Sequence, residues 1–136
     1  MIKTLSLFQN KQPPFLNEKL DLIKANISSF NFLKAKELIL EIIFYMPFEK
    51  DLWNKLSICL TNLKEYKKAI SVYNTLIFLE PNNANIYIDA AKCFLSLNEY
   101  KKALISLNKA EKITKDKKIL DLIFILKKQN NLINYE

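Results

Sequence analysis

The sequence predicts an all-α chain, a superhelix of three helix-turn-helix repeats followed by a C-terminal capping helix. Three observations support this prediction. First, the pentapeptide EYKKA at residues 65–69 recurs at residues 99–103, and the same offset of thirty-four residues places Cys59 on Cys93. Second, one further period back, Ala35 aligns with Ala69 and Ala103. Third, apolar residues within each unit recur three and four positions apart, which is typical of helices with one buried face.

The first fifteen residues are predicted to be an arm that precedes the repeats. Within residues 1–15 a polar stretch is followed by Pro13 and Pro14, which prevent a helix from running through it. The first repeat, about residues 16–49, begins with a predicted helix at 16–30. Its second helix, at 32–46, is apolar nearly all round, so we expect it to be sandwiched between neighbours until Pro47 ends it.

The second repeat, about residues 50–83, contains predicted helices at 51–63 and 66–80. We expect Ala69 where these helices cross, because a small side chain lets the two axes approach to about 8–10 Å. Pro81 ends the second helix since it has no amide hydrogen to donate. The third repeat, about residues 84–117, repeats the pattern, with helices predicted at 85–97 and 100–113.

The turns within the repeats lack glycine, because the chain contains none. Asn62 and Asn98 lie near the predicted turns. Asparagine tolerates a left-handed backbone better than other non-glycine residues do. We therefore expect these two asparagines to replace glycine there.

The last predicted helix, at 118–132, caps the array and is more apolar than a cap facing solvent requires. One interpretation is that it covers the third repeat with one face and a partner protein with another. The other is that it forms a homodimer interface. The first is preferred.

The composition argues against several classes of function. The net charge is +7, but all 21 basic residues are lysines, and they are mixed with acidic residues along the chain. Arginine, the residue best suited to bidentate contacts with phosphate and guanine, is absent, so nucleic-acid binding is not expected. Without histidine or a close cysteine pair, neither a metal site nor another cofactor is expected. The chain also lacks a glycine-rich phosphate loop and a nucleophile beside a base, so an enzyme is not expected.

The cysteines and the apolar segments favour a cytoplasmic protein. Cys59 and Cys93 lie on the apolar faces of predicted helices, as small buried hydrophobic residues rather than a disulfide. The N-terminus lacks the long apolar run and the cleavage site of a signal peptide. The apolar run at 119–126 contains Asp121 and is too short to span a membrane.

The pattern of the second repeat, with Trp53, Leu56, Ala69, Tyr73 and Pro81, resembles the tetratricopeptide repeat. Residues 45–48, 66–73 and 90–95 further resemble the class II chaperones of bacterial type III secretion. That resemblance implies a bacterial cytoplasmic chaperone for hydrophobic translocator proteins, which holds an extended apolar client segment in the concave groove of the array. The chain departs from the family in its missing glycines and its short N-terminal arm. The family usually dimerises through a longer arm, so the resemblance does not decide between a monomer and a homodimer.

The groove expected here lies on the face of the first helices opposite the core stripe. Apolar side chains on that face suit an apolar peptide, and amides and lysines beside them suit its backbone carbonyls. The candidate client-binding residues are Leu20, Lys24, Ile27, Asn54, Ile58, Thr61, Asn62, Ile88, Lys92 and Leu95.

A generic repeat adaptor or scaffold for protein–protein interaction is the alternative. One such adaptor captures an acidic C-terminus, as co-chaperones of the large heat-shock proteins do. That clamp needs lysine and asparagine at fixed groove positions. Here Leu20, Asn54 and Ile88 form one row across the helices, so the match is partial.

Overall fold

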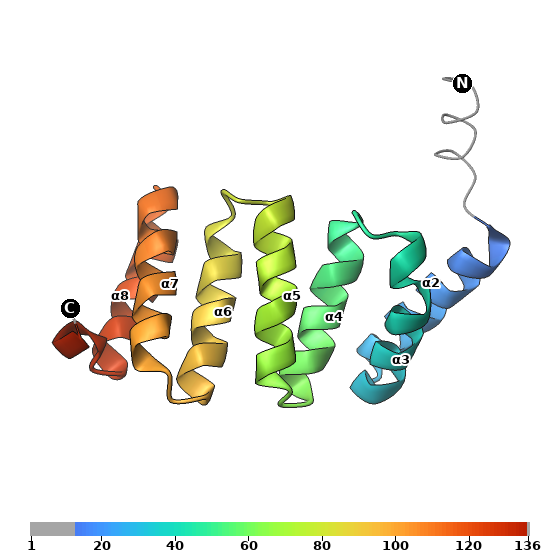
Figure 1. The fold of residues 1–136 in the computed structure, drawn as a ribbon, viewed down its shortest axis with the longest axis horizontal. Coiled ribbons are helices and arrows are strands. Elements are labelled where there is room, and N and C mark those ends of the chain that lie inside the picture. Colours follow the sequence, from blue (N-terminus) through green and yellow to red (C-terminus); the bar gives the residue numbers. More distant parts are fainter. Residues whose placement is uncertain (1–12, 136) are drawn as a thin grey trace, which may run out of the picture.

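A computed structural model describes residues 13–135, and all regular structure in that range is helical (Figure 1). The elements are α2 (Pro14–Ser28), α3 (Phe32–Ile42), η1 (Ile43–Tyr45), α4 (Lys50–Asn62), α5 (Tyr66–Leu79), α6 (Ala84–Ser96), α7 (Tyr100–Ile113), α8 (Lys117–Gln129) and η2 (Leu132–Tyr135). The η elements are short 3₁₀ helices. The all-α prediction is confirmed. The predicted arm lies almost wholly outside the described residues.

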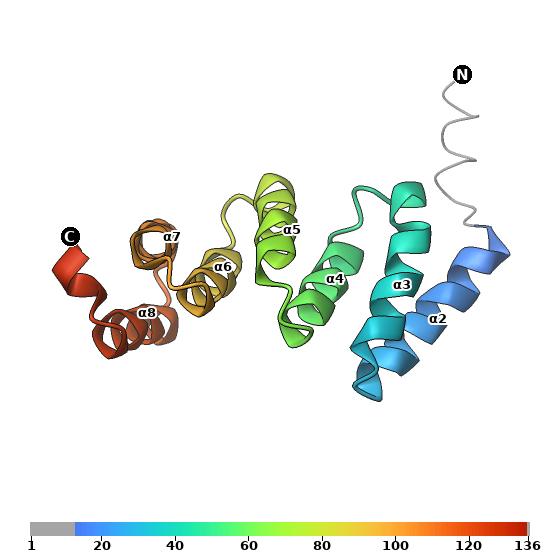
Figure 2. The ribbon, with the colours of Figure 1, turned by 60° about the horizontal axis from the view of Figure 1, so that its bottom comes forward.

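The helices stand side by side in chain order, and each packs on the next (Figure 1). Turned toward the viewer, they alternate between two rows: α2, α4, α6 and α8 form one row, and α3, α5 and α7 form the other (Figure 2). Ala35, Ala69 and Ala103 are fully buried in α3, α5 and α7, as expected for small residues at helix crossings. None of the helices between residues 13 and 135 has both the length and the apolarity needed to cross a bilayer.

The core consists of two clusters that meet at α6. The first cluster contains buried residues of α2 to α5 together with Ile86, Ala90 and Cys93 of α6. The second contains Ala84, Ile88 and further residues of α6 together with buried residues of α7, α8 and η2. Helix α6 therefore buries side chains on two faces, which makes it the shared wall of both clusters.

Three equivalent turns end α2, α4 and α6 with the same hydrogen-bond pattern. Phe30, Lys64 and Asn98 adopt left-handed φ angles of 60°, 61° and 59°. In each turn the following amide bonds back to the carbonyl five residues earlier, as in Glu65 N to Leu60 O at 2.9 Å. This is the Schellman pattern, in which glycine is the usual residue. The prediction for Asn98 is confirmed. The prediction for Asn62 is wrong, because Asn62 is still helical and Lys64 takes the left-handed position.

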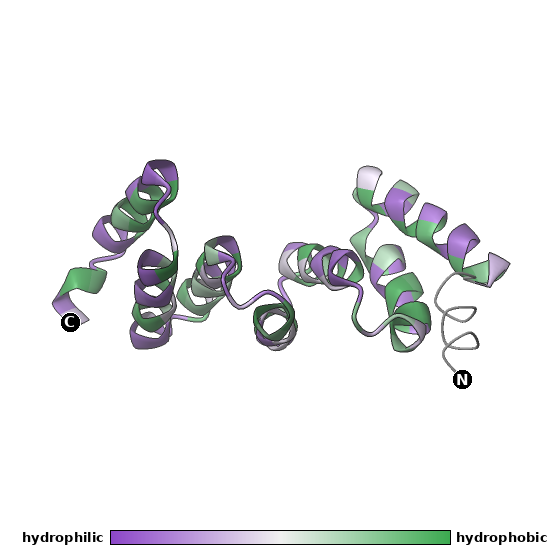
Figure 3. Cartoon of the chain, turned by 90° about the horizontal axis from the view of Figure 1, so that it is seen from above, coloured by the Kyte–Doolittle hydropathy of each residue, from purple (hydrophilic) through white to green (hydrophobic). Residues whose placement is uncertain are grey.

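Helices α3 and α8 differ most from the sequence prediction. Helix α3 carries mostly hydrophobic residues (Figure 3), but its Leu33 and Leu40 are exposed, as are Phe44 and Tyr45 of η1, so the segment predicted as one helix is not sandwiched on all sides. It packs on α2 and α4, and its Lys36 forms an ion pair with Glu65, the residue before α5. At the other end, α8 stops at Gln129, and Leu132 begins η2, where it is buried against α7.

Helix α8 covers the third repeat with one face only. Ile123 is buried in the second core cluster, and Ile119 and Leu126 pack against that cluster. Leu122, Phe124 and Ile125 remain exposed. The excess apolar surface predicted from the sequence is therefore present in the structure.

Candidate functional site

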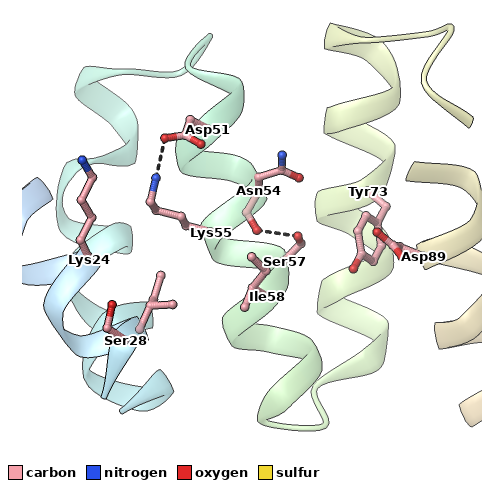
Figure 4. A pocket seen from close by; sticks show the side chains of 10 residues that line it. Lys24, Ser28, Asp51, Asn54, Lys55, Ser57, Ile58, Tyr73 and Asp89 are labelled. Atoms are coloured by element: carbon pink, nitrogen blue, oxygen red, sulfur yellow. Dashed lines mark hydrogen bonds and ion pairs between the residues drawn. The ribbon is translucent and has the colours of Figure 1, made fainter. Parts of the chain in front are cut away.

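A cavity of about 560 Å³ opens between α2, α4, α5 and α6 (Figure 4). Its residues share a position on the open side of the first helices, except for Tyr73, which reaches it from α5. The lining residues are Lys24, Ile27, Ser28, Asp51, Asn54, Lys55, Ser57, Ile58, Tyr73 and Asp89. A smaller cavity of about 180 Å³ adjoins it through the shared residues Lys24, Asp51 and Lys55. We call the two cavities together the groove.

Five of the predicted client-binding residues line the groove. Lys24, Ile27, Asn54 and Ile58 line the larger cavity, and Leu20 lines the smaller one beside Met46. Ile58 is 44% exposed, whereas Leu20 and Ile27 are half-buried because they also pack against the first core cluster. The exposed part of Ile58 provides apolar surface at the centre of the groove.

Ile88 is a correction to the sequence analysis, which placed it on the open face. It is 2% exposed and belongs to the second core cluster. Helix α8 contacts α6 and α7, and its Ile123 lies in the same cluster, so this part of α6 is closed. Asn54, one period earlier, faces the groove instead.

Four further predicted residues lie outside the groove. Asn62 donates its side-chain amide to the carbonyl of Ile58 at 2.8 Å, and the hydroxyl of Thr61 donates to the carbonyl of Ser57. Both are therefore already bonded within their own helix. Lys92 is an exposed residue of α6 that does not line the groove, and Leu95 packs against the second core cluster.

Six lining residues of the larger cavity were not predicted from the sequence, among them the acidic residues Asp51 and Asp89, and the smaller cavity adds Met46, Glu49 and Leu52. A signal for part of this set was present, because Lys55 and Asp89 are one period apart and so occupy the same position on successive first helices. Two of these residues, Ser57 and Tyr73, combine two roles. They are buried, but both also border the cavity.

The charged groups of the groove are not all paired alike. Asp51 and Lys55 form an ion pair one turn apart on α4. Asp89 lies 4.0 Å from Lys92, at the limit of an ion pair, and half of its side chain is accessible. Partial burial raises the pKa of the Asp89 carboxyl, and Lys92 lowers it only in part. Burial also raises the pKa of the Tyr73 phenol, with a smaller contribution from the Asp89 charge.

The two cysteines lie away from the groove opening. Cys59 and Cys93 are free and buried in the first core cluster, as the sequence analysis predicted. Burial raises the pKa of each thiol to about 11. Within residues 13–135 no group of histidine, cysteine, aspartate and glutamate side chains has an arrangement that would hold a metal ion.

The tetratricopeptide repeat family profile matches residues 51–83 and 84–117, which hold α4 to α7. The chain carries tetratricopeptide repeats. In arrays of this kind, small rotations between units create a concave surface, and here the groove lies on the row of first helices. A search of curated proteins by sequence gave no match.

Several solved structures share this fold at low sequence identity. SycD, a type III secretion chaperone of Yersinia enterocolitica solved with a peptide of the translocator YopD, superimposes with a TM-score of 0.79, 16% identity and coverage of 90% of this chain and 97% of SycD. PcrH of Pseudomonas aeruginosa, solved with the chaperone binding region of PopD, superimposes with a TM-score of 0.77 at 13% identity, and the match covers 92% of this chain and 97% of PcrH. The TPR2AB domain of yeast Sti1, in a complex with pHSP90, superimposes with a TM-score of 0.64 at 23% identity, and the match covers 80% of this chain and 42% of the Sti1 chain.

Proposed function

We propose that this protein is a bacterial cytoplasmic type III secretion chaperone that holds extended apolar segments of hydrophobic translocator proteins in the groove. The observation that supports this function most directly is the exposed isoleucine at the centre of an open groove. The fold adds support, because SycD and PcrH, which share it over nearly their whole length, were solved with translocator segments. We also propose that the groove is shared by repeats at about 16–49, 50–83 and 84–117.

The groove offers both kinds of contact that an extended segment needs. Ile58 and Ile27 provide apolar surface, and burying an aliphatic anchor there would contribute about 1.5–3 kcal/mol. The Asn54 amide and the ammonium of Lys24 lie beside them and can donate to backbone carbonyls. Affinity in this arrangement comes mainly from apolar contact.

The alternative function, a generic repeat adaptor, is carried by the likeness to Sti1. An adaptor that captures an acidic C-terminus would use Lys24 and Asn54, which do line the groove. However, the carboxylate of Asp89 lines the same cavity without a close ion-pair partner and would repel an acidic peptide. The groove therefore favours an apolar segment over an acidic one.

The experiment is a fluorescence titration of leucine-rich extended peptides against the parent protein and Ile58→Asp. The variant should bind at least about tenfold more weakly, because a carboxylate would be desolvated against an apolar anchor without a partner. Its stability should change little, since Ile58 is 44% exposed. The Ile88→Asp variant is unsuitable because it would place a charge in the core.

Ile125→Asp is the matched control, because Ile125 is 47% exposed on α8 and is not a groove residue. It should bind the peptides like the parent. Equal affinities of the parent and Ile58→Asp would contradict the groove as the binding site. A loss confined to Ile125→Asp would assign binding to the exposed face of α8 instead.

A further inference from the structure

The groove has different charges at its two walls. Lys24 stands on α2, Asp89 stands on α6, and Ile58 and Tyr73 lie between them (Figure 4). Asp51 and Lys55 also line the cavity, but they pair with each other and leave little net charge. In the larger cavity, the charges that remain for a bound segment are therefore an ammonium group at one wall and a carboxylate at the other. The smaller cavity, which Lys24 also lines, adds the carboxylate of Glu49 on the Lys24 side.

Asp89 is the less well satisfied of these two groups. Its only ion-pair partner among the described residues is Lys92, at 4.0 Å, and no hydrogen-bond donor reaches its carboxylate within residues 13–135. The side chain of Lys92 is itself half accessible, so this pair is weak. The raised pKa of Asp89 has the same origin, since partial burial removes water that the neighbouring lysine does not replace.

We propose that the segment held in this groove carries a cationic side chain next to its apolar anchor, and that this side chain pairs with Asp89. The inference rests on the proposed function and specifies which segments the groove selects. With the apolar anchor packed on Ile58, a lysine or arginine of the segment would form a charge-assisted hydrogen bond with the carboxylate of Asp89. Lys24 at the opposite wall repels a second cation there, so the charge pattern also favours one direction of the bound chain.

The test uses three sets of fluorescent extended peptides built on one neutral leucine-rich sequence. In the first set a single lysine is moved through the sequence one position at a time. The second and third sets carry glutamine or glutamate at the same positions. Scanning every position makes the comparison independent of the register in which the peptide binds.

At the best position, the parent protein should bind the lysine peptide about twofold to fivefold more tightly than the glutamine peptide, the range expected of a partly exposed ion pair. The glutamate peptide should bind more weakly than either. High salt should reduce these differences without abolishing binding. The lysine–glutamine comparison needs no protein variant, so it does not depend on how a mutant folds.

Asp89→Asn should abolish the preference for the lysine peptide over the glutamine peptide. Asp121→Asn is the matched control: it removes the same charge from an exposed position on α8 and should keep the preference. Equal binding of the lysine and glutamine sets to the parent, or a preference that persists in Asp89→Asn, would overturn this inference and leave the groove function intact. Failure of every peptide to bind the parent would contradict the groove function, and this inference with it.

Discussion

Lys64 has a backbone conformation that suits glycine, in a chain that has none. A left-handed conformation costs a residue with a side chain about 1–2 kcal/mol. Glycine avoids this steric cost, but only part of it is gained, because glycine loses more backbone entropy on folding. Lys64→Gly should therefore raise the free energy of unfolding by about 0.5–1 kcal/mol, measured by urea denaturation.

Lys109→Gly provides the comparison for this effect, because Lys109 is exposed in the interior of α7 with an ordinary helical backbone. It should lower the free energy of unfolding by about 1 kcal/mol. If both substitutions destabilise alike, the left-handed turn does not limit stability.

The buried thiols should make the protein less stable at alkaline pH. A thiol that ionises near pH 9.0 in the unfolded chain keeps its proton to about pH 11 when folded, for both Cys59 and Cys93. Between these values the folded state binds more protons, so the free energy of unfolding falls as pH rises, by up to about 1.4 kcal/mol per pH unit for each thiol. Cys93→Ala should show a shallower fall in urea titrations between pH 9 and 11. Parallel slopes for the parent and Cys93→Ala would contradict the burial of this thiol.

Single positions also show where prediction from the sequence fails. Asn54 and Ile88 occupy equivalent positions, and periodicity alone treats them alike. Their environments differ because α8 contacts α6 and α7 and closes the second core cluster around Ile88. Burial at such a position depends on the apolarity of the helix packed beside it. That is a tertiary property, which the repeat pattern does not contain.

At the scale of helices, the alanines at the crossings determine how closely each pair can pack. Ala103 is fully buried between α6 and α7 in the second core cluster. Ala103→Leu should lower the free energy of unfolding by about 1–3 kcal/mol, because the added atoms must displace packed neighbours. Thermal denaturation followed by circular dichroism measures this. Ala25→Leu, on the exposed face of α2, should be nearly neutral, and equal stability of both variants would argue against close packing at the crossing.

Helix bounds were predicted well where side-chain periodicity and turn residues agree. Helix α7 begins and ends at the predicted residues, 100 and 113. Helix α3 ends at Ile42, four residues before its predicted end, and continues as a 3₁₀ turn. Pro47 disfavours helical geometry in the residue before it, and a terminal turn often tightens in this way. The proline thus marks the end of the segment, but not the residue at which the α-helix changes.

For the whole molecule, the order of packing predicts the order of opening. Each helix packs mainly on its neighbours in the chain, and α6 contributes to both core clusters. Hydrogen exchange followed by mass spectrometry should therefore show the slowest exchange in α5 and α6 and faster exchange in α2 and α8. Uniform protection from α2 to α8 would indicate instead that the array opens as one unit.

The alternation of helices in two rows also has a mechanical consequence. An array in which each helix packs mainly on the next resembles a short spring: slight rotations at successive helix contacts add up along the row, and no contact needs to break. Lys24 and Asp89 lie on different helices of this array, α2 and α6. The distance between these two charges therefore changes when the array bends, and a bound segment can lengthen or shorten it.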